Sequence, residues 1–169
     1  MIPPQANDRG FSLPELAVVL VVTALIATLG ASAYKTYVVR AQIATSLAIA
    51  AGAQEHVTQS FRQYGEPPAN REAAGLSRAS NADSGRYVDS IDVVDGRVEL
   101  HFGNEADAAI AGRTLSLTPF ETINRDVFWI CGNRLARAGL SPLGFASGTR
   151  QAVQVLTQIE ARYLPSTCR

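Results

Sequence analysis

The sequence has few of the side chains on which enzymes and metal sites depend. Only two of its 169 residues are histidines, His56 and His101, and two are cysteines, and none stands at the spacing of metal ligands. The segment GLSPLG at 139–144 differs from the G-x-S-x-G turn of serine hydrolases, and no phosphate-binding loop or dinucleotide fingerprint occurs. The sequence therefore predicts neither an enzyme nor a protein with a metal or a cofactor.

The sequence also lacks a net charge. Its 15 basic residues balance its 15 acids, so nothing draws the whole chain toward nucleic acid or an acidic membrane surface. Lysine is nearly absent: Lys35 is the only lysine, and the other basic residues are arginines. One region is biased: after residue 132, five arginines accompany a single acid, Glu160. These arginines are Arg134, Arg137, Arg150, Arg162 and Arg169.

One long apolar run extends from Phe11 to Ala33. Its 23 residues can cross a bilayer and exceed the apolar core of a typical secretory signal. The preceding segment, MIPPQANDRG, has one arginine against one aspartate, so it lacks the basic region of such a signal. Glu15 is unexpected, because a carboxylate in hydrocarbon costs at least ~2.5 kcal/mol on insertion scales. A simple membrane anchor leaves this acid unexplained.

Segments at both ends of the chain carry a family resemblance. Residues 9–30, RGFSLPELAVVLVVTALIATLG, resemble the class III signal of type IV pilins and their relatives. The segment YKTYVVRAQ at 34–42 is similar to the one that follows the membrane stretch in that family. Near the other end, VFWICG at 127–132 resembles the strand with the first cysteine, and RYLPSTCR at 162–169 resembles the C-terminus of bacterial pilins. The resemblance is strong at both ends and weak in the middle.

The resemblance implies that the chain is processed at Gly10. In the family a prepilin peptidase cuts after this glycine, so residues 1–10 are expected to be a leader and Phe11 to be N-methylated. Cleavage creates an α-amino group that is positively charged at neutral pH. In a bundle of such helices, the amine of one subunit would approach Glu15 of a neighbour, and an ion pair would replace an isolated charge. Glu15 would also lie in the first helical turn, which favours an acid and tolerates Pro14.

The two cysteines, Cys131 and Cys168, both follow the membrane segment. A pair in this position suggests an exported domain closed by one disulfide, and two free thiols in a cytosolic protein are the alternative. The bond would enclose 36 residues, a longer loop than in many members of the family. Contacts made by shorter loops are therefore not transferred to this chain.

The region from residue 15 to residue 64 predicts one nearly continuous helix. It contains no proline and only two glycines, and its length would be roughly 80 Å at about 1.5 Å per residue. Its first part, 11–34, is apolar on all sides and is expected to form the transmembrane and filament-core helix. Its second part, 35–64, is amphipathic, and its apolar stripe is expected to pack against a globular head. The stripe consists of Ile43, Leu47, Ala50, Ala53, Val57, Phe61 and Tyr64.

The segments after the helix predict a loop and then a sheet. Residues 65–85 form a helix stop and a loop, with room for a short helix near 71–75. By resemblance, this loop is a variable surface suited to subunit contacts or glycans, and an ordinary solvated connection is the alternative. Residues 86–131 are expected to hold a four-stranded antiparallel sheet, with a hairpin turn at Asp95–Gly96. The strands are 86–94, 97–102, 113–119 and 126–132.

The remaining features complete a pilin-like α+β fold with a disulfide-closed C-terminal region, 132–169. Within this region, 150–163 favours a short helix over a strand. The aromatic residues on the predicted strands, Tyr87, Phe128 and Trp129, are expected in the core. Two further tyrosines follow the apolar run, where aromatic rings anchor at a membrane interface or pack against neighbouring helices in a filament. They are Tyr34 and Tyr37.

The resemblance implies that the protein is a structural subunit of a type IV pilus. The helix would hold it in the inner membrane with the head in the periplasm. The pilus assembly machinery would then pack the same helix into the core of a helical homopolymer outside the cell. Such a filament serves adhesion, twitching motility or DNA uptake, with DNA or a host surface as partner. The arginines Arg134, Arg137, Arg150 and Arg162 are candidates for DNA contact, and a solvated face or pairing with acids of neighbouring subunits is the alternative.

Three other functions remain open at this point. A minor pilin is one, because many major pilins have a proline near Ser32 and a glycine at Ala24, where this chain departs from the pattern. A pseudopilin of a type II secretion system is another, although the late cysteine pair favours a pilin. The third is a specialised pilin that binds DNA or a surface.

Overall fold

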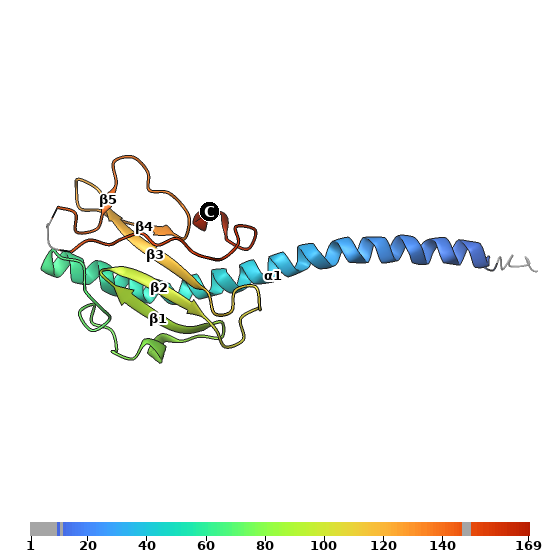
Figure 1. The fold of residues 1–169 in the computed structure, drawn as a ribbon, viewed down its shortest axis with the longest axis horizontal. Coiled ribbons are helices and arrows are strands. Elements are labelled where there is room, and N and C mark those ends of the chain that lie inside the picture. Colours follow the sequence, from blue (N-terminus) through green and yellow to red (C-terminus); the bar gives the residue numbers. More distant parts are fainter. Residues whose placement is uncertain (1–9, 11, 147–149) are drawn as a thin grey trace, which may run out of the picture. The chain divides into compact units, whose positions relative to one another are not determined.

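The computed structural model describes residues 10, 12–146 and 150–169. The chain divides into two compact units, Met1–Thr36 and Tyr37–Arg169, and the helix α1 (Leu13–Tyr64) contributes to both. Within the second unit, α1 packs against an antiparallel sheet (Figure 1). The prediction of one nearly continuous helix is confirmed, since α1 comprises 52 residues.

The amphipathic part of α1 buries most of the predicted stripe, with Leu47 only partly buried and Tyr64 exposed. Ile43, Ala50 and Val57 are fully buried, and Phe61 is nearly so. The prediction for Tyr64 is wrong, because its side chain is 68% exposed. Tyr64 is the last helical residue, and the chain turns at Gly65 with a φ of 75°, so the ring at the end of the stripe stays exposed although Phe61, one turn earlier, is buried.

The sheet has the four predicted strands in sequential order. They are β1 (Val88–Val94), β2 (Arg97–Phe102), β3 (Thr114–Glu121) and β4 (Val127–Cys131), each antiparallel to the next. The hairpin turn is also confirmed: Asp95 and Gly96 both have positive φ, at 50° and 82°, as a two-residue type I′ turn requires. A two-residue strand that was not predicted, β5 (Ser141–Pro142), pairs with β3.

The aromatic residues of the strands differ in burial. Trp129 packs partly buried against the core, and its Nε1 donates a hydrogen bond to Thr58 Oγ1 of α1 at 3.4 Å. Tyr87 is half-buried. Phe128 lies on β4, the last strand in the sheet order, and is 50% exposed, so its expected place in the core is wrong.

The C-terminal segment covers the sheet without regular structure. Residues 150–163 form neither a helix nor a strand, so the predicted helix is wrong. Hydrogen bonds between side chains and backbone join the segment to the sheet instead: Arg97 of β2 donates to the carbonyl of Val153 at 2.7 Å, and Thr157 Oγ1 of the segment donates to the carbonyl of Thr114 on β3 at 2.7 Å. Because Ile159 packs into the core at 2% exposure, the segment forms part of the folded head.

The connection between helix and sheet consists mainly of turns. The short helix considered near 71–75 does not form, and these residues make hydrogen-bonded turns. A 3₁₀ helix, η1 (Ser80–Asp83), lies further along the loop. The loop is anchored by Arg71, a side chain that is 5% exposed and pairs with Asp83. The chain between helix and sheet is therefore a loop, as predicted, but one with a fixed conformation.

Candidate functional site

The first unit presents an apolar helical surface that its own chain does not cover. An 18-residue window of α1 has a mean hydropathy of 2.4, and none of it is buried. The exposed aliphatic side chains lie on all sides of the helix, which is long and apolar enough to cross a membrane. The largest exposed fractions are those of Leu13, Val18, Leu20 and Ile26.

Two threonine hydroxyl groups of this part of α1 are satisfied within the helix. Thr23 Oγ1 donates to the carbonyl of Val19 at 2.6 Å, and Thr28 Oγ1 donates to the carbonyl of Leu25 at 2.8 Å. A hydroxyl bonded to its own helix adds little cost in hydrocarbon. Glu15 is therefore the polar group of this surface that most needs a partner.

Glu15 lies in the first turn of α1, where the helix dipole favours a negative charge. Ser12 Oγ donates to Glu15 Oε2 at 3.4 Å, and the two residues have the S-x-x-E spacing of a capping box. The S-x-x-E spacing is visible in the sequence and is typical of a helix start, but it was not used in the prediction of the helix. It accounts for an acid at a helix start, but the carboxylate remains exposed to whatever surrounds the helix.

The predicted processing site lies at the edge of the described residues. Gly10 is exposed. Phe11 lies outside the described residues, as do residues 1–9. Cleavage between Gly10 and Phe11, N-methylation of Phe11 and its pairing with Glu15 therefore stay predictions.

The two cysteines form the predicted disulfide. Cys131 ends β4 and Cys168 lies in the last short helix, η2 (Ser166–Cys168), with 4.5 Å between their Cα atoms. Cys168 is fully buried, and its carbonyl accepts a hydrogen bond from the backbone amide of Asn133 at 3.1 Å. The bond joins the end of the chain to the sheet across a separation of 37 residues.

A long helix with an uncovered apolar half, a four-stranded antiparallel sheet and a late disulfide agree with one known family. A family model described as pilin, a bacterial filament protein, matches residues 39–169. The chain belongs to the type IV pilin family. The family resemblance and the fold class predicted from the sequence are thereby confirmed, and this pilin is a structural subunit of a type IV pilus.

Named relatives are similar over nearly the whole pilin. The type IV major pilin protein PilE1 of Neisseria gonorrhoeae is 31% identical over 163 residues, which cover 96% of this chain and 87% of the relative. A fimbrial protein of Neisseria meningitidis serogroup B is 32% identical, with coverages of 96% and 94%. The fimbrial protein EcpC of Eikenella corrodens is 28% identical, with coverages of 96% and 91%. Pilins are structural proteins rather than enzymes.

The arginines proposed for DNA contact have different surroundings. Arg150 pairs with Asp95 at 3.1 Å and donates to the carbonyl of Pro67, so it clamps the helix-to-sheet loop onto the hairpin turn. Arg162 donates to Glu160 at 2.6 Å, and this hydrogen bond, more than the charge of Glu160, raises the pKa of Arg162. Each of these two guanidinium groups already has an acid beside it.

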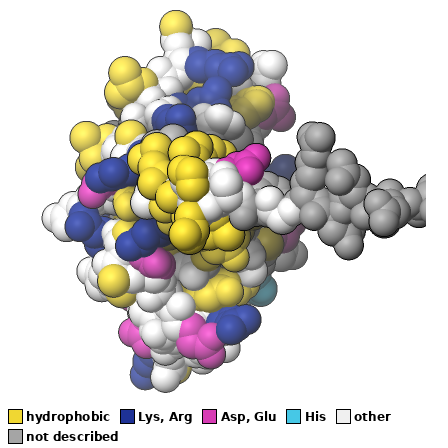
Figure 2. All heavy atoms as spheres, turned by 90° about the vertical axis from the view of Figure 1, so that its right-hand side faces the viewer, with side chains coloured by type: hydrophobic (Ala, Val, Ile, Leu, Met, Phe, Trp, Pro, Cys, Tyr) yellow, Lys and Arg dark blue, Asp and Glu magenta, His cyan; other side chains and the backbone are white. Residues whose placement is uncertain are grey.

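The other two candidates, Arg134 and Arg137, line one shallow cavity of about 230 Å³ beside the exposed ring of Phe128. On the face shown in Figure 2, basic side chains lie in separate groups among acidic ones. The described residues therefore bring Arg134 and Arg137 together but give Arg150 and Arg162 local partners. DNA contact stays a prediction, and its strongest candidates are now these two.

Among the described residues, no group of three or more His, Cys, Asp or Glu side chains could hold a metal ion. His101 instead contacts Thr114 Oγ1 through Nδ1 at 3.1 Å and faces Asp92 through Nε2 at 3.5 Å. His56 lies on α1 and is exposed. The surroundings of both histidines are those of ordinary surface residues.

Proposed function

We propose that this pilin polymerises through the uncovered part of α1, which serves first as a membrane anchor and then as the core of the filament. The observation that supports it most is a helical surface with a mean hydropathy of 2.4, none of it buried, that carries one acid at its start. Such a surface must be covered by lipid or by other helices. Moving it from lipid into a bundle changes what covers it without exposing it to water.

Glu15 supplies the specificity of this exchange. After removal of residues 1–10 by prepilin peptidase, the methylated amine of Phe11 carries a positive charge. In a low dielectric an isolated charge is strongly unfavourable, whereas a paired one is tolerated, so the amine of one subunit and the carboxylate of its neighbour fix their relative register. Apolar side chains alone would allow the helices to slide past one another.

The cell location follows from the same helix. Before assembly the head lies in the periplasm and the helix in the inner membrane, and the assembly machinery then transfers subunits into an extracellular filament. Adhesion, twitching motility and DNA uptake are the activities that such a filament supports. Arg134, which is half-buried, and Arg137, which is exposed, line a cavity with no acid among its lining residues, and this pair is the feature most compatible with DNA as a partner.

Replacement of Gly10 by valine tests the processing step. We expect the unprocessed protein to accumulate in the membrane with a mass about 1 kDa above that of the wild-type subunit, because the ten-residue leader is retained. Intact-mass spectrometry of the purified protein measures this difference. Replacement of Gly30 by valine is the control and should leave processing unchanged, whereas normal processing of the Gly10 variant would contradict the assigned cleavage site.

Deletion of the gene tests whether the subunit is the main component of the filament. We propose the major role, because relatives with that printed description align along 96% of the chain. The expected result is loss of all filaments in electron micrographs, restored by the gene on a plasmid. Sparse but intact filaments would instead assign the protein to the minor pilins.

A further inference from the structure

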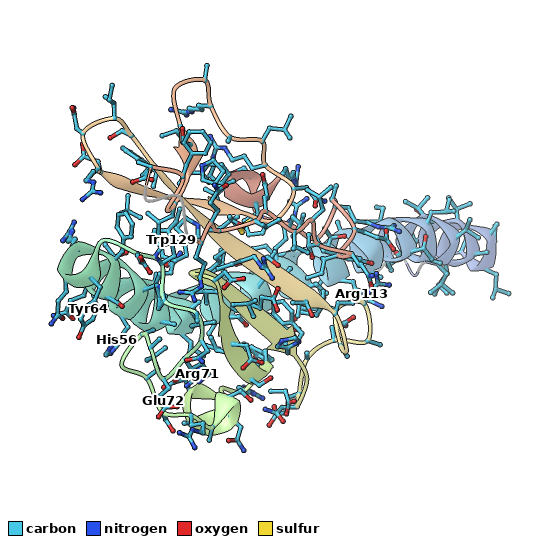
Figure 3. All side chains as sticks on the ribbon, turned by 60° about the vertical axis from the view of Figure 1, so that its left-hand side comes forward. His56, Tyr64, Arg71, Glu72, Arg113 and Trp129 are labelled. Carbon is cyan, nitrogen blue, oxygen red and sulfur yellow. A yellow bond between two sulfur atoms is a disulfide. The ribbon has the colours of Figure 1, made fainter. Side chains whose placement is uncertain are left out.

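A polar groove lies at the C-terminal end of α1, within the second unit. It consists of two adjoining depressions of about 350 and 530 Å³ that share Ser60, Tyr64, Glu72 and Ala73. Figure 3 shows His56 and Tyr64 on the last turns of the helix, and Glu72 on the loop that follows. Two depressions of this size provide the volume typical of a small-molecule site.

The walls of the groove are held in place by buried contacts. Ser60 Oγ donates to the carbonyl of Ala73 at 3.1 Å, which joins the helical wall to the loop wall. Behind the loop, the buried Arg71 donates to the carbonyl of Ser77 at 2.8 Å and also binds the carbonyl of Ile91 on β1. The groove is therefore formed before any ligand arrives, which lowers the entropic cost of binding.

Several polar side chains along the groove have unused hydrogen-bonding capacity. His56, Gln59 and Gln63 are exposed and make no hydrogen bond to another of the described residues. Two amides and an imidazole both donate and accept hydrogen bonds. The ring of Tyr64, 68% exposed, adds an apolar face with a hydroxyl at its end.

The charges around the groove disfavour an anion, and most of them are already paired. The C-terminal end of α1 carries the negative end of the helix dipole, and Glu66 and Glu72 line the groove. Arg150 also lines one of the two depressions but is already paired with Asp95 at 3.1 Å, so phosphate or nucleic acid is disfavoured. The carboxylate of Glu72 already accepts two hydrogen bonds of 2.7 Å from Arg78. A neutral ligand fits this balance best.

We propose that this groove binds a neutral carbohydrate. Sugar hydroxyl groups both donate and accept, as the free amides and imidazole do, and the C–H face of a pyranose ring matches the exposed face of Tyr64. The groove belongs to a single chain, so its binding is independent of polymerisation and can be measured on unassembled subunits. Failure to bind sugar would thus leave the assembly role of α1 untouched.

Saturation-transfer NMR on the full-length pilin tests this site. The protein is held in deuterated dodecylphosphocholine, a detergent without a sugar group, and is mixed in turn with lactose, maltose and diacetylchitobiose. We expect transfer to the ring protons of at least one disaccharide and none in protein-free micelles. Tyr64→Ala should weaken binding about tenfold, because the stacking face is lost, and Tyr64→Phe should retain most of it.

A second tyrosine on the same helix provides a matched control. Tyr37 is 72% exposed and does not line the groove, so Tyr37→Ala should bind the sugar as the wild type does. Circular dichroism should show all three variants folded, since neither ring is buried. The proposal is overturned if none of the three disaccharides receives saturation, or if Tyr37→Ala and Tyr64→Ala lower binding equally.

Discussion

Replacement of Glu15 by valine is expected to leave the pilin in the membrane and to remove most filaments from the cell surface. Insertion is retained because the change removes a carboxylate from an apolar helix. Assembly fails because the α-amine of a neighbouring Phe11 then has no counter-charge, and breaking a buried pair in this way costs about 3–5 kcal/mol. Membrane fractionation measures the first effect, and counting pili in electron micrographs measures the second.

Two variants separate the proposed ion pair from simpler explanations. Ser12→Ala removes the hydroxyl that contacts Glu15 but keeps the charge, so filaments should persist if the intersubunit pair matters more than capping. Glu55→Val removes the other acid of α1 and should also leave piliation intact. Normal piliation of the Glu15→Val strain would contradict the ion pair, as would an equal loss of filaments in the Ser12→Ala strain.

Replacement of Cys168 by serine is expected to lower the melting temperature of the head by about 10–15 °C. The chain-entropy model assigns a loop of this size roughly 4 kcal/mol, and a head of this length loses several degrees for each kcal/mol. The effect should be large because the enclosed segment includes 150–163, which has no helix or strand of its own. Calorimetry of the full-length protein in detergent provides the measurement.

Both cysteines should behave as one unit in this experiment. Cys131→Ser and the double variant are expected to melt at the same temperature as Cys168→Ser, because each removes the same bond. Mass spectrometry under non-reducing conditions should find the peptides of Cys131 and Cys168 linked in the wild type. Free thiols in the exported wild-type protein would contradict the bond, and an unchanged melting temperature would contradict its stabilising role.

The strand pattern was predictable because its determinants are local. Between Asp95–Gly96 and Phe102 the side chains alternate with period two, and the structure buries Val98, Leu100 and Phe102 on one face as this alternation requires. The two-residue turn needs positive φ, which aspartate and glycine accept most readily. Periodicity and turn chemistry thus suffice for elements stabilised by near neighbours.

Residues stabilised by distant parts of the chain were not predictable in the same way. The segment 150–163 follows the sheet because Arg97 and Thr157 bond across 56 and 43 residues, and such contacts leave no period in the sequence. In the sequence Arg150 is one of five arginines after residue 132. The structure shows that it joins the hairpin turn at Asp95 to the helix-to-sheet loop at Pro67. A charge count cannot distinguish a paired guanidinium from a free one.

The sequence by itself determined the long apolar-to-amphipathic helix, the position of Glu15 at its start, the hairpin and the family. Each depends on residue order within one element, where spacing alone decides which side chains share a face. Only the tertiary structure decided that Tyr64 and Phe128 are exposed, that 150–163 is irregular and that the groove beside Glu72 exists. Burial depends on which elements come to lie over a residue, and that is fixed by long-range packing rather than by local pattern.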